Sequence, residues 1–138
     1  MIILDTNVLS ELTHDRPETR VVEWVDAQPV SEVHTTAITV AELVFGVALL
    51  GAGRRRRELA DRLGLLFEGG LSDRILPFDA EAAVEWGHLR AEHRRAGRSF
   101  SSADLQIAAI AMVQGATVVT RNVDDFGHPG LVVVNPWE

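Results

Sequence analysis

The sequence predicts an α/β fold in which a mainly parallel central sheet carries helices on both faces. Short apolar segments that suit strands alternate along the chain with longer segments of helical periodicity. The strand-like segments are almost continuously apolar, which is typical of strands buried on both faces. No repeat, low-complexity run or linker interrupts this pattern. We therefore expect residues 1–138 to form a single domain.

The expected strands are short. Met1-Ile2-Ile3-Leu4 is apolar throughout and ends at Asp5, so residues 1–5 suit a buried strand. The others lie between helical segments and are rich in branched residues. They are expected at residues 32–38, 74–78, 116–120 and 130–134.

The expected helices are set by their periodicity and by their end signals. Thr6 and Asn7 are helix-opening residues, and proline and glycine mark the ends of several segments. Residues 101–115 are apolar nearly all round, which predicts a buried helix. The helices are expected at residues 7–13, between Pro17 and Pro29, at 39–50, in an amphipathic segment ended by Gly69-Gly70, from Asp79 to near Gly97, and at 101–115.

Composition excludes several classes of protein. The sequence has no apolar stretch of about twenty residues, so it predicts no membrane span. No secretory signal precedes the first strand, and we therefore expect a cytoplasmic protein. The chain has no cysteine, and each of its 13 basic residues is an arginine. The absence of lysine excludes a P-loop and Schiff-base catalysis. A net charge of −7 argues against broad attraction to nucleic acid, but not against a nuclease that reaches phosphate through a metal.

Acidic residues recur where strands end and the next helices begin. Asp5 follows the first strand, Glu42 and Asp104 lie early in two helices, and Asn122, Asp124 and Asp125 follow a later strand. Because the carboxyl ends of parallel strands share one edge, these side chains are expected to converge there. Clustered carboxylates repel one another unless a cation neutralises them. Hard oxygen ligands suit Mg²⁺ or Mn²⁺.

A structural interpretation of the same acids stays open. Thr39-x-x-Glu42 and Ser101-x-x-Asp104 both match the capping box, in which the acid bonds back to the backbone of the cap residue. Asp5 is as compatible with a turn as with chemistry, and Asp124 is better explained as a turn residue.

Four stretches in this order resemble the PIN-domain ribonucleases. They are LDTNVLSEL, TVAELVFGV, SSADLQIAAIA and TRNVDDF followed by NPW, and together they cover essentially the whole chain. More narrowly, they resemble the VapC-type toxins of toxin–antitoxin pairs, close to the FitB-like branch. The resemblance implies a three-layer α/β/α fold with a mainly parallel sheet of four or five strands. It also implies RNA cleavage that depends on Mg²⁺ or Mn²⁺, a VapB-like antitoxin that inhibits the toxin in a hetero-oligomer, and a homodimer.

The resemblance also implies roles for individual residues. Asp5, Glu42 and Asp104 match the first three family acids, as metal ligands and catalytic groups. Many relatives have aspartate where this chain has Asn122, and others have asparagine with an aspartate three positions on, as here. Asn122 and Asp125 are therefore expected to contribute to metal or water binding. Supporting hydrogen bonds are expected from Thr6, Asn7 and Ser102.

Other sequence features leave alternatives open. Arg121 lies beside the expected site and is a candidate for contacting RNA phosphate. The runs Arg54 to Arg57 and Arg90 to Arg98 are either solvated helix faces or contacts to RNA or to an acidic partner. The apolar helix 39–50 is expected to be part core and part groove for an antitoxin helix or a dimer seam. A catalytically inactive PIN-like interaction domain and a DNA nuclease are the alternative functions.

Overall fold

A computed structural model of the chain describes residues 1–138 and contains one parallel sheet of five strands. The strand order is β3-β2-β1-β4-β5, and every neighbouring pair is parallel. The strands are β1 (Ile2–Leu4), β2 (Val33–Thr36), β3 (Ile75–Leu76), β4 (Thr117–Val119) and β5 (Val133–Val134). Each predicted strand is present but shorter than expected, because hydrogen bonding to a neighbour ends before the apolar run does.

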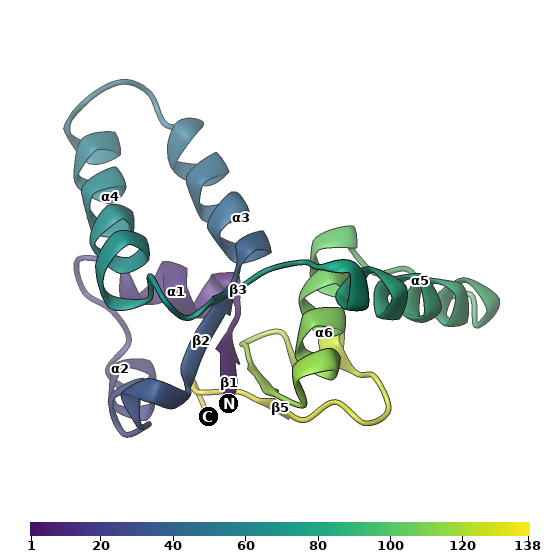
Figure 1. Ribbon diagram of the computed structural model, residues 1–138. Helices are drawn as coiled ribbons and strands as arrows, with labels where there is room; N and C mark the ends of the chain where they lie inside the picture. Colours follow the sequence, from purple (N-terminus) through teal and green to yellow (C-terminus); the bar gives the residue numbers. More distant parts are fainter.

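Six α-helices connect these strands (Figure 1). They are α1 (Thr6–Leu12), α2 (Thr19–Asp26), α3 (Ala37–Ala48), α4 (Arg54–Leu65), α5 (Ala80–Arg95) and α6 (Ser102–Gln114). Short 3₁₀ segments lie at Val30–Glu32 and at Val123–Phe126, and one π-helical turn, Leu66–Gly70, continues α4. Because this π-helical turn continues α4, the amphipathic pattern extends to the glycine pair at residues 69 and 70.

Two helix starts differ from the sequence prediction. Helix α1 begins at Thr6 rather than at residue 7, because its cap is Asp5, whose carboxylate accepts a hydrogen bond from the Thr6 backbone N–H. Helix α3 begins at Ala37 rather than at residue 39, because Thr36 is its cap and accepts from the Thr39 backbone N–H. The cap therefore lies at the strand end in both places: Asp5 directly follows β1, and Thr36 is the last residue of β2.

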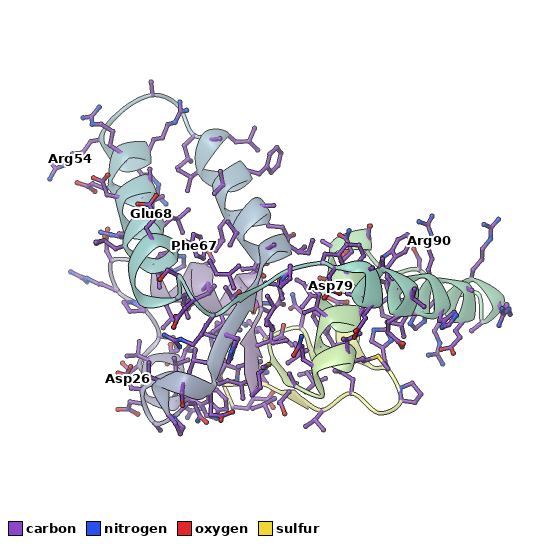
Figure 2. All side chains as sticks on the ribbon, viewed as in Figure 1. Asp26, Arg54, Phe67, Glu68, Asp79 and Arg90 are labelled. Atoms are coloured by element: carbon purple, nitrogen blue, oxygen red, sulfur yellow. The ribbon has the colours of Figure 1, made fainter.

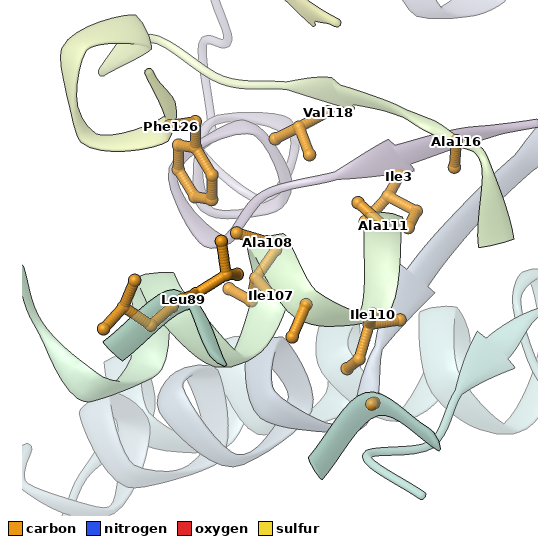
Figure 3. Packing of buried hydrophobic residues seen from close by; sticks show 12 residues of the cluster. Ile3, Leu89, Ile107, Ala108, Ile110, Ala111, Ala116, Val118 and Phe126 are labelled. Carbon is orange, nitrogen blue, oxygen red and sulfur yellow. The ribbon is translucent and has the colours of Figure 1, made fainter. Parts of the chain in front are cut away.

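The sheet lies between two helical layers, as predicted. Side chains alternate along β1, so Ile3 packs with α5 and α6 on one face, while Leu4 packs with α1 and α2 on the other. Figure 3 shows Ile3 and Val118 against the buried side of α6, which carries Ile107 and Ala108. Both strand residues and both helix residues are fully buried. The mostly buried helix 101–115 is therefore confirmed.

Helices α3 and α4 form an antiparallel pair that projects from the carboxyl edge of the sheet (Figure 1). Their far ends have no layer to pack against, and apolar side chains there remain exposed. No helix of the chain is both long enough and apolar enough to cross a membrane.

Candidate active site

The ends of β1 and β4 place Asp5 and Thr120 side by side at the carboxyl edge of the sheet. The register pairs Leu4 with Val119, so the residues that follow them are neighbours. The Asp5 backbone N–H donates to the Val119 carbonyl at 2.9 Å. Residues more than a hundred positions apart therefore meet where ligand sites of parallel sheets lie.

Asp5 is the most enclosed acid of this edge, with only 4% of its surface exposed. Its Oδ1 accepts from the Thr6 backbone N–H at 2.8 Å. Its Oδ2 accepts from the Thr120 hydroxyl at 2.8 Å and from the Asn7 amide at 3.3 Å. The side chain therefore caps α1 through one oxygen, and the other oxygen is held by hydrogen-bond donors.

Burial is the main reason that the pKa of Asp5 rises to about 6. The hydrogen bonds from Thr120 and Thr6 oppose this rise, whereas the negative charges of Asp104 and Glu42 add to it. The Asp5 carboxyl accepts several hydrogen bonds and is still harder to ionise than an ordinary aspartate. A nearby cation would stabilise its ionised form.

Asn7 and Thr120 fix the position of Asp5. The Asn7 amide N–H₂ donates to the Thr120 hydroxyl at 3.1 Å, and its carbonyl oxygen accepts from the Arg121 backbone N–H at 3.2 Å. The Thr120 hydroxyl also accepts from the Asn122 backbone N–H at 3.1 Å. Thr120 was not among the residues expected from the sequence. The available signal was a hydroxyl residue that ends an apolar strand directly before the Arg121-Asn122 turn.

Glu42 is held by Thr6, whose hydroxyl donates to its carboxylate at 2.7 Å. The Thr6 and Thr39 hydroxyls lie 3.2 Å apart. A hydroxyl has one proton, so Thr6, which gives its proton to Glu42, must accept one from Thr39. The capping-box interpretation of Glu42 is wrong, because α3 is capped by Thr36 and Thr39 lies inside the helix.

Asp104 lies in the first turn of α6 and is half-buried. Its backbone N–H donates to the hydroxyl of Ser101, which caps the helix, at 3.1 Å. Burial raises the pKa of Asp104; the negative charges of Asp125 and Glu42 raise it further, and the Ser101 side chain opposes them. Ser102, expected to support the carboxylates, makes no side-chain hydrogen bond, and Ser101 makes that contact instead.

The turn after β4 brings Asp125 within electrostatic range of Asp104. Asn122 precedes the 3₁₀ turn Val123–Phe126, and its carbonyl accepts from the Asp125 backbone N–H at 3.0 Å. The Arg121 guanidinium is exposed and lies over the Trp137 ring at 5.1 Å. Asp124 is exposed on the same turn.

The donor set suits a hydrated divalent cation. No group of three or more acidic or histidine side chains is close enough, as the side chains stand, to enclose one ion. Mg²⁺ usually keeps several of its waters and binds one or two carboxylates directly. Asp5, Glu42, Asp104 and Asp125 supply hard oxygen donors whose mutual repulsion a cation would relieve. The residues therefore fit such an ion, with one or two carboxylates as direct ligands and the others in contact through its waters.

A family model of the PIN domain matches residues 2–129. The chain belongs to the PIN-domain family. This PIN domain is 43% identical over 138 residues to a VapC ribonuclease, Y4jK, of Sinorhizobium fredii, a match that covers 100% of this chain and 99% of the relative. It is 41% identical to the toxin FitB of Neisseria gonorrhoeae, over 99% of both chains.

Solved structures agree with these sequence relatives. The FitAcB structure from Neisseria gonorrhoeae superposes with a TM-score of 0.91 at 40% identity and covers 100% of this chain and 99% of that one. A VapBC2 structure from Rickettsia felis, bound to a promoter DNA fragment, superposes with a TM-score of 0.83 at 26% identity and covers 98% of both chains. The fold and family expected from the four sequence stretches are confirmed.

Proposed function

We propose that this PIN domain is an endoribonuclease, the toxin of a toxin–antitoxin pair, and that it acts with Mg²⁺ or Mn²⁺ in the cytoplasm. The observation that supports this most is the buried Asp5 at the sheet edge, with Glu42 and Asp104 close enough to raise its pKa. Ribonuclease and toxin names among relatives that cover the whole chain support the same function.

The chain's own residues would divide the chemistry as follows. Asp5 and Asp104 would hold the ion directly, while Asn7 and Thr120 keep the Asp5 carboxylate in place. Glu42, exposed and oriented by Thr6, would hold the attacking water and take its proton as general base. Asp125 would help to bind the ion's remaining waters. When bound, the ion would lower the pKa of that water and polarise the scissile phosphate, which would leave 5′-phosphate and 3′-hydroxyl ends.

The antitoxin site we propose is the groove between α3 and α4. It forms a cavity of about 440 Å³ whose lining includes Val40, Val44, Leu63 and Phe67. Phe67, labelled in Figure 2, lies on the π-helical turn that continues α4. Val44 is 51% exposed, although it is apolar. An apolar antitoxin helix would cover this surface. The relatives of known structure include FitAB and VapBC complexes, which supports a partner of this kind. We also propose a homodimer.

The test uses the chain purified free of antitoxin and incubated with RNA and Mn²⁺. We expect RNA cleavage, and we expect a chelator to abolish it. Asp5→Asn and Asp104→Asn should each reduce cleavage at least about 100-fold, because each variant lacks a charged ligand of the ion that polarises the reacting phosphate. Asp26→Asn is the control, because this exposed residue on α2 lies outside the cluster (Figure 2). Equal cleavage by all three variants would contradict the proposal.

The alternative is a PIN-like interaction domain that cleaves nothing. Two observations favour it: asparagine at position 122, and the spacing of the acids, which does not enclose an ion. The same assay separates the two functions, because an interaction domain would bind its antitoxin and leave RNA intact at every Mn²⁺ concentration. A parallel incubation with single-stranded and flapped DNA tests the remaining nuclease alternative.

A further inference from the structure

A cavity of about 460 Å³ opens between the C-terminal half of α5, the loop that follows it and the first turn of α6. Its lining includes the arginines 90, 94 and 98 together with the hydroxyl residues Ser99 and Ser102. Arg90, labelled in Figure 2, projects from α5 into solvent. The site described above uses none of these arginines.

The three arginines have no carboxylate partner in the protein. The arginine ion pairs of the chain involve Arg54, Arg62 and Arg74 instead. Arg90 and Arg94 are four residues apart on one helix, where like charges repel each other. All three arginines are exposed, so in a chain with a net charge of −7 they form a local concentration of positive charge that is free to pair with an anion.

Two further contacts shape this cavity. The guanidinium of Arg90 lies over the Trp86 ring at 5.1 Å, which holds its side chain on the cavity wall. Burial, the neighbouring His93 and the charge of Arg98 together lower the pKa of His128. The positive charge of Arg98 therefore reaches the protein interior behind the cavity.

The cavity and the acid cluster share the first turn of α6. Ser102, on the cavity wall, is two positions before Asp104 in that turn. Residues two positions apart on a helix point to nearly opposite sides, so the cavity and the Asp104 carboxylate lie on different sides of one turn. An RNA that brings a phosphate to Asp104 must overcome repulsion from several carboxylates. Another backbone phosphate of the same strand, which passes around the start of α6, would then reach this basic cavity.

We propose that this cavity binds a backbone phosphate of the RNA strand whose scissile phosphate lies at the acids. Planar guanidinium groups donate paired hydrogen bonds to phosphate oxygens, and serine hydroxyls add single donors. The cavity would position the strand, so that the scissile phosphate lies at the acids. This inference rests on the proposed nuclease function, but binding tests it independently of cleavage.

The experiment measures binding of a single-stranded RNA oligonucleotide by fluorescence anisotropy, with a chelator present so that the RNA stays intact. The RNA has 5′-hydroxyl ends, so every phosphate belongs to the backbone. The variant is Arg94→Gln with Arg98→Gln, which spares the Arg90–Trp86 contact. The matched control is Arg16→Gln with Arg20→Gln, which removes the same charge from exposed positions before and on α2.

We expect the cavity variant to weaken Kd roughly tenfold, because it no longer forms charge-assisted hydrogen bonds to phosphate. The slope of log Kd against log salt should fall by about 0.7 for each backbone phosphate that the variant no longer neutralises on a single strand. The control should change neither quantity. Arg94→Lys with Arg98→Lys keeps the charge but not the planar fork, so it should retain the slope and recover part of the affinity.

Cleavage then separates this inference from the proposed function. With Mn²⁺, the glutamine variant should raise KM more than it lowers kcat, since the strand is positioned less well. If the wild type cleaves RNA and the cavity variant binds and cleaves as the control does, the cavity assignment is wrong and the nuclease stands. If the wild type never cleaves but the cavity variant alone loses RNA binding, the nuclease is wrong, and the cavity is an RNA-phosphate site without a role in positioning a scissile phosphate. Melting temperatures near the wild-type value show that the variants are folded.

Discussion

Replacing Asp5 by asparagine should make the protein more stable at neutral pH while it removes activity. The neutral side chain has the same shape and still accepts from the Thr6 N–H. It no longer leaves a negative charge in a site where only 4% of the residue is exposed. Higher stability together with lost activity is expected where a charge serves function although it destabilises the folded protein.

The magnitude follows from the pKa. A value of about 6 in place of an ordinary 3.8 corresponds to roughly 3 kcal/mol of destabilisation by the ionised form. An asparagine amide at the Oδ2 position loses both accepted hydrogen bonds, from Thr120 and from Asn7, which together cost about 2 kcal/mol. The net gain is about 1 kcal/mol, or roughly 3–5 °C in Tm for a chain of this length.

The sign with pH is fixed because the folded-state pKa is raised. The protonated Asp5 contributes its full stability below the ordinary pKa, and this contribution is lost as pH rises through the folded-state value. The advantage of Asp5→Asn over wild type should therefore be largest near pH 7.5. It should fall by about 2 kcal/mol on going to pH 4.5, where the wild type becomes the more stable protein.

The assay is urea denaturation of the wild type, Asp5→Asn and the exposed control Asp26→Asn at both pH values in the presence of a chelator. Adding Mn²⁺ should then stabilise the wild type and the control, but not Asp5→Asn, because the variant lacks a ligand. An Asp5→Asn protein that is no more stable than the wild type at neutral pH, or whose advantage does not vary with pH, would refute the account of Asp5 as a strained buried charge.

Three further predictions concern the neighbours of this site and the core. Thr120→Val removes a donor that lowers the pKa of Asp5, so the acidic limb of the cleavage–pH profile should move to higher pH. Burial, His93 and nearby positive charge lower the pKa of His128. The neutral imidazole therefore contributes stability above the ordinary pKa near 6.5, and this contribution is lost as pH falls below that value. Denaturation measured across this pH range should show the loss in the wild type and not in His128→Leu. Ile107→Ala removes a fully buried side chain between α6 and the sheet and should reduce the free energy of unfolding by about 2–5 kcal/mol, measured by urea denaturation.

The fold was predictable from the sequence because the periodicity of each segment matched its tertiary environment. The helix at 101–115 is apolar on all sides and packs between the sheet and α5, as its composition indicates. Segment ends were less predictable. A run such as residues 74–78 satisfies the pattern of a strand, but only Ile75 and Leu76 pair with β2, since strand pairing depends on a neighbour that is distant in sequence.

The acids of the candidate site were predictable because parallel strands bring their carboxyl ends together. The donors that hold them were harder to predict, because their partners depend on register. Thr120 lies beside Asp5 only because Leu4 pairs with Val119, and no local pattern around residue 120 shows this. Ser101 and Ser102 are chemically identical, and only the start of α6 decides which one contacts the Asp104 backbone.

The capping alternative for the acids is resolved differently at each position. Asp5 caps α1 through one oxygen, so structure and chemistry share that side chain. At Asp104 the cap is Ser101, three residues earlier; its side chain lowers the pKa of the Asp104 carboxyl, while the charges of Asp125 and Glu42 raise it. Glu42 caps nothing and still receives the Thr6 hydroxyl. If these acids served only as helix caps, they would not need to lie near one another. They raise one another's pKa, so they do lie close together, and a bound cation would relieve their repulsion.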